Sequence, residues 1–137
     1  MMCDPLIESI TSKLTAAGFT VKREYVGDIA DVGSSSFPAF LRVEKIELRE
    51  LIQTRSDERT CREEVTLRIR ALGRDEGFYG ASALADKTEN AVARIYLSEN
   101  MLVKDITCGE IKKNTALGRL EQVIGLTAVT TLSMGGA

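Results

Sequence analysis

Apolar and polar residues alternate most regularly between Arg62 and Ala71. The apolar side of this segment carries Val65, Leu67, Ile69 and Ala71, and the polar side carries Glu64, Thr66, Arg68 and Arg70. A period of two residues is typical of a β-strand with one buried face. From Ala81 to Leu97 the chain has no Gly or Pro, and apolar residues recur at helical spacing at Leu84, Ala91, Val92, Ile95 and Tyr96. We predict that this strand and this helix pack together and form the core of the molecule.

The first part of the chain predicts a helix, a strand and a flexible loop. Helical spacing relates Leu6, Ile7, Ile10, Leu14 and Ala17, and Asp4-Pro5 and Gly18 are residue types that begin and end helices. Phe19 to Val26 then reads as a strand, with Phe19, Val21 and Tyr25 as candidate inward residues. The glycine- and serine-rich composition of residues 27–36 predicts a flexible loop.

A long antiparallel hairpin is predicted in the middle of the chain. Its arms are Phe40 to Thr54 and Thr60 to Leu72, and the polar segment Thr54 to Thr60 forms its tip. Along the first arm the apolar residues change from odd to even positions, so they would change sides of a regular strand. This change indicates a β-bulge near Glu44-Lys45. We expect the hairpin to project beyond the body, where a neighbouring subunit of a symmetric oligomer could cover its edges. The breakers Gly73 to Gly77 separate it from the central helix.

The last third of the chain predicts two strands. Leu102 to Cys108 is the first, Gly109 to Gly118 is a polar connection, and Leu120 to Met134 has the β-branched composition of the second. Residues 135–137 form a flexible tail. The whole pattern predicts a single α+β domain over residues 1–137, with a mixed, mainly antiparallel sheet and the N-terminal and central helices packed on it.

The composition argues against nucleic-acid-binding, membrane-spanning and secreted proteins. The 137 residues include 18 basic and 20 acidic side chains, which gives a net charge of −2 and a pI near 5.3, whereas nucleic-acid binders are usually basic and patchy. No apolar run approaches the ~20 residues that cross a bilayer. Met1 to Leu6 lacks the charged start and apolar middle of a signal peptide. We therefore expect a cytoplasmic protein without a membrane contact or tight binding to DNA.

The sequence offers little catalytic or metal-binding chemistry. It contains no histidine, which removes the usual Ser-His and Cys-His nucleophile arrangements. The three cysteines, Cys3, Cys61 and Cys108, are odd in number and unclustered, so we expect reduced thiols, with Cys108 in the core. The acidic pairs Glu63-Glu64 and Asp57-Glu58 lie among arginines, and neighbouring strand residues face opposite ways. We predict a solvated, salt-bridged hairpin, no enzyme activity, and no catalytic, cofactor-binding or metal-binding residue.

Three arginines form a basic stripe on the polar side of the hairpin. They are Arg62, Arg68 and Arg70. Two interpretations remain open, simple solvent exposure and contact with acidic residues of a neighbouring subunit.

The order of elements resembles the tail terminator, or tail completion, proteins of long-tailed bacteriophages. The likeness spans most of the chain, and it is carried by the helix ending at Ala16-Ala17-Gly18-Phe19, the start of a strand at Phe37 to Val43, the alternating strand Glu64 to Ala71, the helix Ala81 to Leu97 and the closing segment Leu120 to Met134. In that family, α+β subunits form a ring, usually a hexamer, that caps the head-proximal end of the tail tube.

The resemblance implies a virion structural protein, assembled in the host cytoplasm, that stops tube polymerisation and joins tail to head. Its partners would be further copies of itself, the tail tube protein and the head connector or neck protein, and DNA would pass through the lumen without specific binding. It implies no catalysis and no cofactor. The hypothesis places subunit contacts at Arg55, Asp57, Glu58, Arg59, Arg62, Arg68 and Arg70, and ordering on assembly at Asp28, Asp31, Gly33 and Ser35.

Two alternatives stay open. A small acidic secretion chaperone, which dimerises and holds an unfolded effector segment, has a similar size and a leading helix. Its pattern usually closes with a further helix, whereas Leu120 to Met134 favours a strand. Another phage neck or head-completion protein would differ only in the partner that each surface binds.

Overall fold

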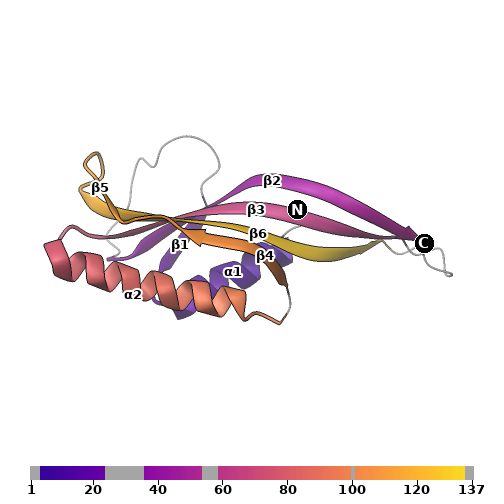
Figure 1. Ribbon diagram of the computed structural model, residues 1–137, viewed down its shortest axis with the longest axis horizontal. Helices are drawn as coiled ribbons and strands as arrows, with labels where there is room; N and C mark the ends of the chain where they lie inside the picture. The colour runs from indigo at the N-terminus through magenta and orange to yellow at the C-terminus, as the bar shows by residue number, and fades with distance from the viewer. Residues whose placement is uncertain (1–3, 24–35, 54–58, 100, 135–137) are drawn as a thin grey trace.

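The computed structural model describes residues 4–23, 36–53, 59–99 and 101–134, with the side chains of 4, 49–53, 59–61 and 131–134 left undescribed. Within these ranges a six-stranded sheet carries two helices on one face (Figure 1). The elements are α1 Asp4–Ala16, β1 Thr20–Arg23, β2 Pro38–Gln53, β3 Arg59–Arg74, α2 Gly77–Tyr96, β4 Leu102–Cys108, β5 Lys112–Asn114 and β6 Arg119–Met134. The predicted α+β class, with an N-terminal and a central helix on the sheet, is confirmed.

Strand order in the sheet is β1-β2-β3-β6-β4, and β5 also pairs with β6. Only the β1–β2 pair is parallel among the described strands, so the sheet is mixed and mainly antiparallel. The predicted alternating strand is β3, and it lies between β2 and β6. Its position explains the regular pattern, because a central strand with helices on one side has one dry and one polar face.

The core lies between the sheet and the helices. All four apolar residues predicted on the inner side of β3 are fully buried, namely Val65, Leu67, Ile69 and Ala71. The helices contribute Ile10 and Leu14 from α1 and Leu84 and Ile95 from α2 to the same cluster. Two expectations were wrong. Tyr96, on the last turn of α2, is exposed, and Cys108 is exposed because it ends the edge strand β4.

The end of α1 follows the predicted glycine signal. Gly18 has φ +102°, a left-handed conformation that strains other residues. The amide of Phe19 donates to the Leu14 carbonyl at 3.1 Å, and the amide of Gly18 donates to the Thr15 carbonyl at 3.0 Å. These two bonds form a Schellman motif, which satisfies carbonyls at the helix end and turns Phe19 into the core beside Leu14.

The start of α2 differs from the prediction. Gly73 and Arg74 continue β3, and the helix begins at Gly77 rather than at Ala81. A Cβ atom on Gly80 would lie 2.3 Å from the Arg74 carbonyl oxygen. The first turn of α2 therefore packs directly on the end of β3, and this approach, which only glycine permits, lets the helix start one turn early.

The predicted hairpin and its bulge are confirmed. The pairing of β2 with β3 shifts between Val43 and Lys45, which leaves Glu44 as the extra residue. Val43 packs against the core, and after the bulge Ile46 pairs with Val65. The bulge thus keeps apolar residues on the helix-facing side along both halves of β2.

The positions of several strands and strand ends could be assigned only from the tertiary structure. Arg59, predicted in the polar tip, belongs to β3, because it pairs with β2 on one side and β6 on the other, whereas Thr60 is in β3 as the predicted second arm requires. The expected connection Gly109 to Gly118 contains β5, which is held by backbone pairing with β6 rather than by an apolar pattern. Residues 24–26 of the predicted first strand, residues 27–35 of the loop, residues 54–58 of the tip and the tail 135–137 lie outside the described residues.

Candidate interaction surfaces

Three strands continue past the ends of both helices and form what we call the arm (Figure 1). The arm comprises the last parts of β2 and β6 and the first part of β3, from Ile46, Val129 and Glu64 outward to Gln53, Met134 and Arg59. β1 pairs only with residues Pro38 to Leu41 of β2, and β4 pairs with β6 only as far as Val129. Both outer edges of the arm are therefore unpaired within the described residues.

The helix-facing side of the arm leaves apolar side chains uncovered. Ile46 is 43% exposed and Leu48 is 63% exposed. Ile46 lies opposite Val65, which is fully buried in the core, so Ile46 is on the same side of the sheet and would also be core if a helix reached it. We call Ile46 and Leu48 the apolar arm patch.

A buried carboxyl group lies next to this patch. Glu63 pairs with Leu48, has only 1% of its surface exposed, and its Oε1 atom has no hydrogen-bond partner. Burial raises the pKa of Glu63 above the usual 4.5. The prediction that Glu63 and Glu64 face opposite ways is confirmed, but the prediction that both are solvated is wrong for Glu63, because β3 is the central strand of the arm.

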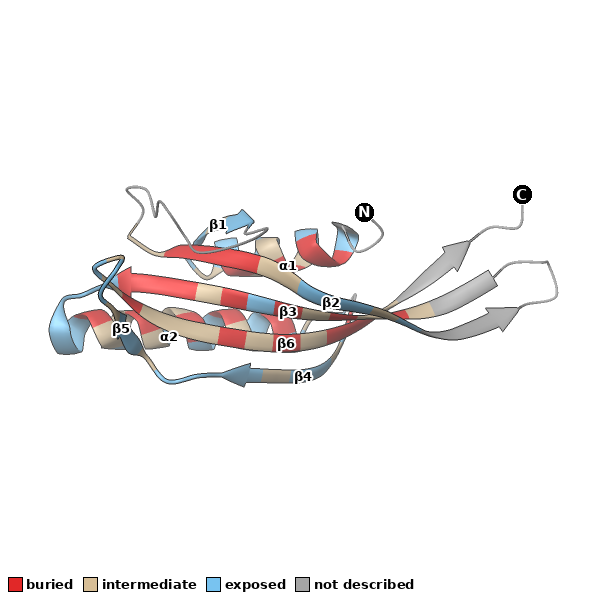
Figure 2. Cartoon of the chain, turned by 90° about the horizontal axis from the view of Figure 1, so that it is seen from above, coloured by how far each residue is buried: buried red, intermediate tan, exposed pale blue. Residues whose placement is uncertain are grey.

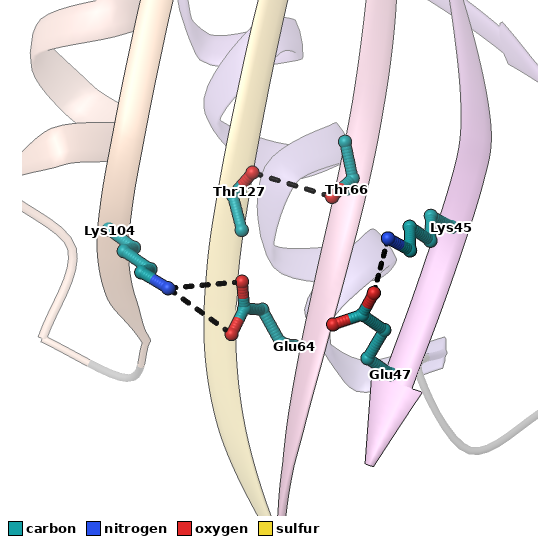
Figure 3. Close-up of polar contacts among 6 residues, drawn as sticks. All are labelled: Lys45, Glu47, Glu64, Thr66, Lys104 and Thr127. Atoms are coloured by element: carbon teal, nitrogen blue, oxygen red, sulfur yellow. Dashed lines mark hydrogen bonds and ion pairs between the residues drawn. The ribbon is translucent and has the colours of Figure 1, made fainter. Parts of the chain in front are cut away.

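The opposite side of the sheet, which we call the open face, carries no helix among the described residues (Figure 2). Its polar side chains are linked across strands, as Figure 3 shows. Lys104 Nζ donates to both carboxylate oxygens of Glu64, at 3.2 and 3.4 Å, and Thr66 and Thr127 share a hydrogen bond of 3.4 Å. Lys45 forms an ion pair with Glu47.

A two-bond ion pair on the open face joins Arg70 and Glu121. Arg70 donates from Nη2 and Nε to the two carboxylate oxygens at 3.0 and 3.3 Å, and Asn114 adds a third donor at 2.8 Å. Burial by itself would raise the pKa of Glu121, but the hydrogen bonds from Arg70 and Asn114 and the charges of Arg70 and Arg68 outweigh burial and lower it. Arg70 thus has an acidic partner in its own chain.

Next to this pair the open face has a shallow hollow of about 470 Å³. Gly125, which has no side chain, lies in its lining between β3 and β4, with Arg68, Asp105 and Thr107 around it. The Nη1 atom of Arg68 lies 3.6 Å from Oε1 of Glu44, the bulge residue. The lining of the hollow is both polar and apolar, and the charge of Arg68 is partly neutralised by Glu44 within the chain.

The predicted contact residues divide into three groups. Arg55, Asp57 and Glu58, and the loop residues Asp28, Asp31, Gly33 and Ser35, lie outside the described residues, and for Arg59 only the backbone is described. Arg68 and Arg70 occupy the open face as predicted. Arg62 is partly buried and also has an interaction partner.

Sequence reasoning missed an aromatic pair at the start of α2. Phe78 and Tyr79 are each 81% exposed, and their rings meet edge to face with centroids 6.1 Å apart. We call Phe78 and Tyr79 the aromatic pair. The available signal was two adjacent aromatic residues between Gly77 and Gly80 in a segment otherwise typical of a turn.

Other kinds of site were also sought. Among the described residues, no cluster of three or more Cys, Asp or Glu side chains could hold a metal ion. Neither α1 nor α2 has the length and apolarity that would let it span a membrane.

Comparison with known proteins gives only distant structural likenesses. No protein-family model and no curated protein matches the chain. The chain is similar to the crystal structure of the type 4 fimbrial biogenesis protein PilO from Pseudomonas aeruginosa, with a TM-score of 0.36 and 14% sequence identity, over 96% of this chain and 70% of the PilO chain.

Proposed function

We propose that this protein is a phage virion structural subunit, similar in role to the tail terminator proteins, that forms a ring at the head-proximal end of the tail. The ring stops polymerisation of the tail tube, contacts the tube protein and the head connector, and lets DNA pass through its lumen. The role is non-catalytic. The observation that carries the proposal is the arm, with its exposed apolar patch and two edges that no strand of the described residues pairs with.

An arm of this kind favours assembly. Exposed apolar side chains next to free strand edges promote association with other chains. In a closed ring each subunit can cover the arm of its neighbour, so one surface is buried repeatedly without open-ended growth. The element order also supports the proposal, since the helix, the three strands, the second helix and the closing strands follow the order on which the resemblance rests.

The alternatives fit less well or share the same arm. A secretion chaperone of the kind considered above would close with a helix, whereas residues Arg119–Met134 form β6. A head-completion or neck protein would use the arm in the same way and bind a different partner.

The proposal is tested by the mass of the purified protein. We expect light scattering across a concentration series to show a hexamer, or monomers that assemble as concentration rises, and negative-stain images to show rings. A protein that stays monomeric at every concentration would contradict the proposal, and a stable dimer without rings would favour the chaperone.

The arm itself is tested by a double substitution. Ile46→Thr with Leu48→Thr removes apolar surface but keeps residues that suit a strand, so it should abolish rings and leave the monomer folded. Ile46→Val with Leu48→Val is the matched control and should still form rings. Circular dichroism and thermal unfolding check the fold of both variants.

A further inference from the structure

The aromatic pair is not part of the core cluster of the described residues. Both rings are mostly exposed, and each contacts the other rather than the core. Exposed aromatic residues that are held together in this way are typical of the centres of protein interfaces. Two such rings offer about 300–500 Å² of surface, a large share of the ~800 Å² that each partner buries in a standard interface.

The aromatic pair and the apolar arm patch are well separated along β3. The arm patch pairs with Val65 and Glu63, towards the middle of β3, and the aromatic pair follows Arg74, where β3 ends. At ~3.3 Å per residue, Val65 and Arg74 are about 30 Å apart. One chain therefore cannot bring its own two patches together.

The two patches are also chemically alike. The segment from Gly77 to Ala85 carries no charged residue, and α2 has no acidic residue in its first turn. On the arm, the charged side chains Lys45 and Glu47 point to the open face and form an ion pair there, away from the apolar arm patch (Figure 3). Bringing the patches together would bury mainly apolar surface.

We propose that the aromatic pair of one subunit packs on the apolar arm patch of the next subunit. This inference rests on the proposed ring and specifies its interface as a head-to-tail contact between two different surfaces. Such a heterologous contact generates a closed ring when the rotation between subunits is a simple fraction of a turn. The occupant of both patches is thus a second copy of this chain.

A mixing experiment tests the inference. Phe78→Ser with Tyr79→Ser should prevent ring formation, as the arm variant Ile46→Thr with Leu48→Thr does. Each variant keeps one intact half of the contact, so an equimolar mixture should form dimers of twice the subunit mass and nothing larger. Mixtures that remain monomeric would overturn the inference, because a contact between identical surfaces gives no rescue.

Two controls separate this inference from the proposed function. Phe78→Tyr with Tyr79→Phe keeps both rings and should assemble normally. Tyr96→Ser with Leu97→Ser removes another largely exposed apolar pair, at the other end of α2, and it should also assemble. If the wild type forms rings and the aromatic variant does too, or if the Tyr96 variant alone fails, the inference is wrong and the ring stands. If the wild type never assembles, the proposed function itself is wrong.

Discussion

Glu63 illustrates how position on a strand changes the chemistry of one residue. Its neighbour Glu64 faces the open side and accepts hydrogen bonds from Lys104, whereas Glu63 turns inward, where its Oε1 atom has no partner. An ionised carboxylate in such a place lacks both water and a donor. The folded protein therefore favours the neutral acid at this position more than the unfolded chain does.

This preference makes stability depend on pH. Because the pKa of Glu63 is raised in the folded state, the penalty is absent below the usual pKa of 4.5 and grows as pH rises through the folded value. We expect Glu63→Gln, which cannot ionise, to be more stable than the wild type at pH 8 and to lose this advantage towards pH 5. Urea unfolding at a series of pH values measures the difference.

The control variant is Glu89→Gln, on an exposed turn of α2, which measures the general effect on stability of losing one negative charge. An advantage of the Glu63 variant that does not change with pH would contradict a role for ionisation and would point to packing alone.

At the scale of elements, close backbone contact decides where α2 begins. Gly80 lies against the Arg74 carbonyl, so the helix and the end of β3 approach more closely than a side chain would allow. The same contact directs the aromatic pair, which precedes Gly80 on the first turn, away from the core and into solvent.

Gly80→Ala tests this contact. Alanine favours a helix interior by up to ~1 kcal/mol, but here the added Cβ would meet a backbone atom, and overpacking costs about 1–3 kcal/mol. We expect a net loss of about 1–2 kcal/mol in the free energy of unfolding. The matched change Ser82→Ala, at an exposed position of the same turn region, should stay within ~0.5 kcal/mol. A Gly80 variant as stable as the wild type would show that the helix can move away from β3.

At the scale of the whole molecule, the body buries its apolar residues within its own chain, whereas the arm leaves some of them exposed. The body closes its own core between the sheet and the helices, whereas the arm continues β2, β3 and β6 beyond them. Under the proposed function this division separates folding from assembly, because the arm can be altered without exposing the core.

Deleting Ser56 to Arg59 at the tip of the hairpin should therefore abolish ring formation and leave the monomer folded. Thermal unfolding and light scattering of the same samples measure the two properties independently. Normal rings from the deletion variant would show that the tip is not required and would confine the contact to the arm nearer the body.

The sequence by itself determined the elements whose patterns report one-sided burial. The alternation of β3, the helical spacing of α1 with Gly18 at its end, the bulge near Glu44 and the bounds of β4 all follow from local periodicity and turn chemistry, and the structure agrees with them. The α+β class follows from the order of these elements.

Only the tertiary structure decided the features that depend on neighbours distant in sequence. β5 exists because β6 offers backbone partners, Cys108 is exposed because β4 is an edge, and Glu63 is buried because its strand is central. The exposure of the aromatic pair and of the apolar arm patch was likewise decided by which elements cover them. Periodicity tells which side of an element is apolar, but whether another element covers that side depends on where the chain returns in space.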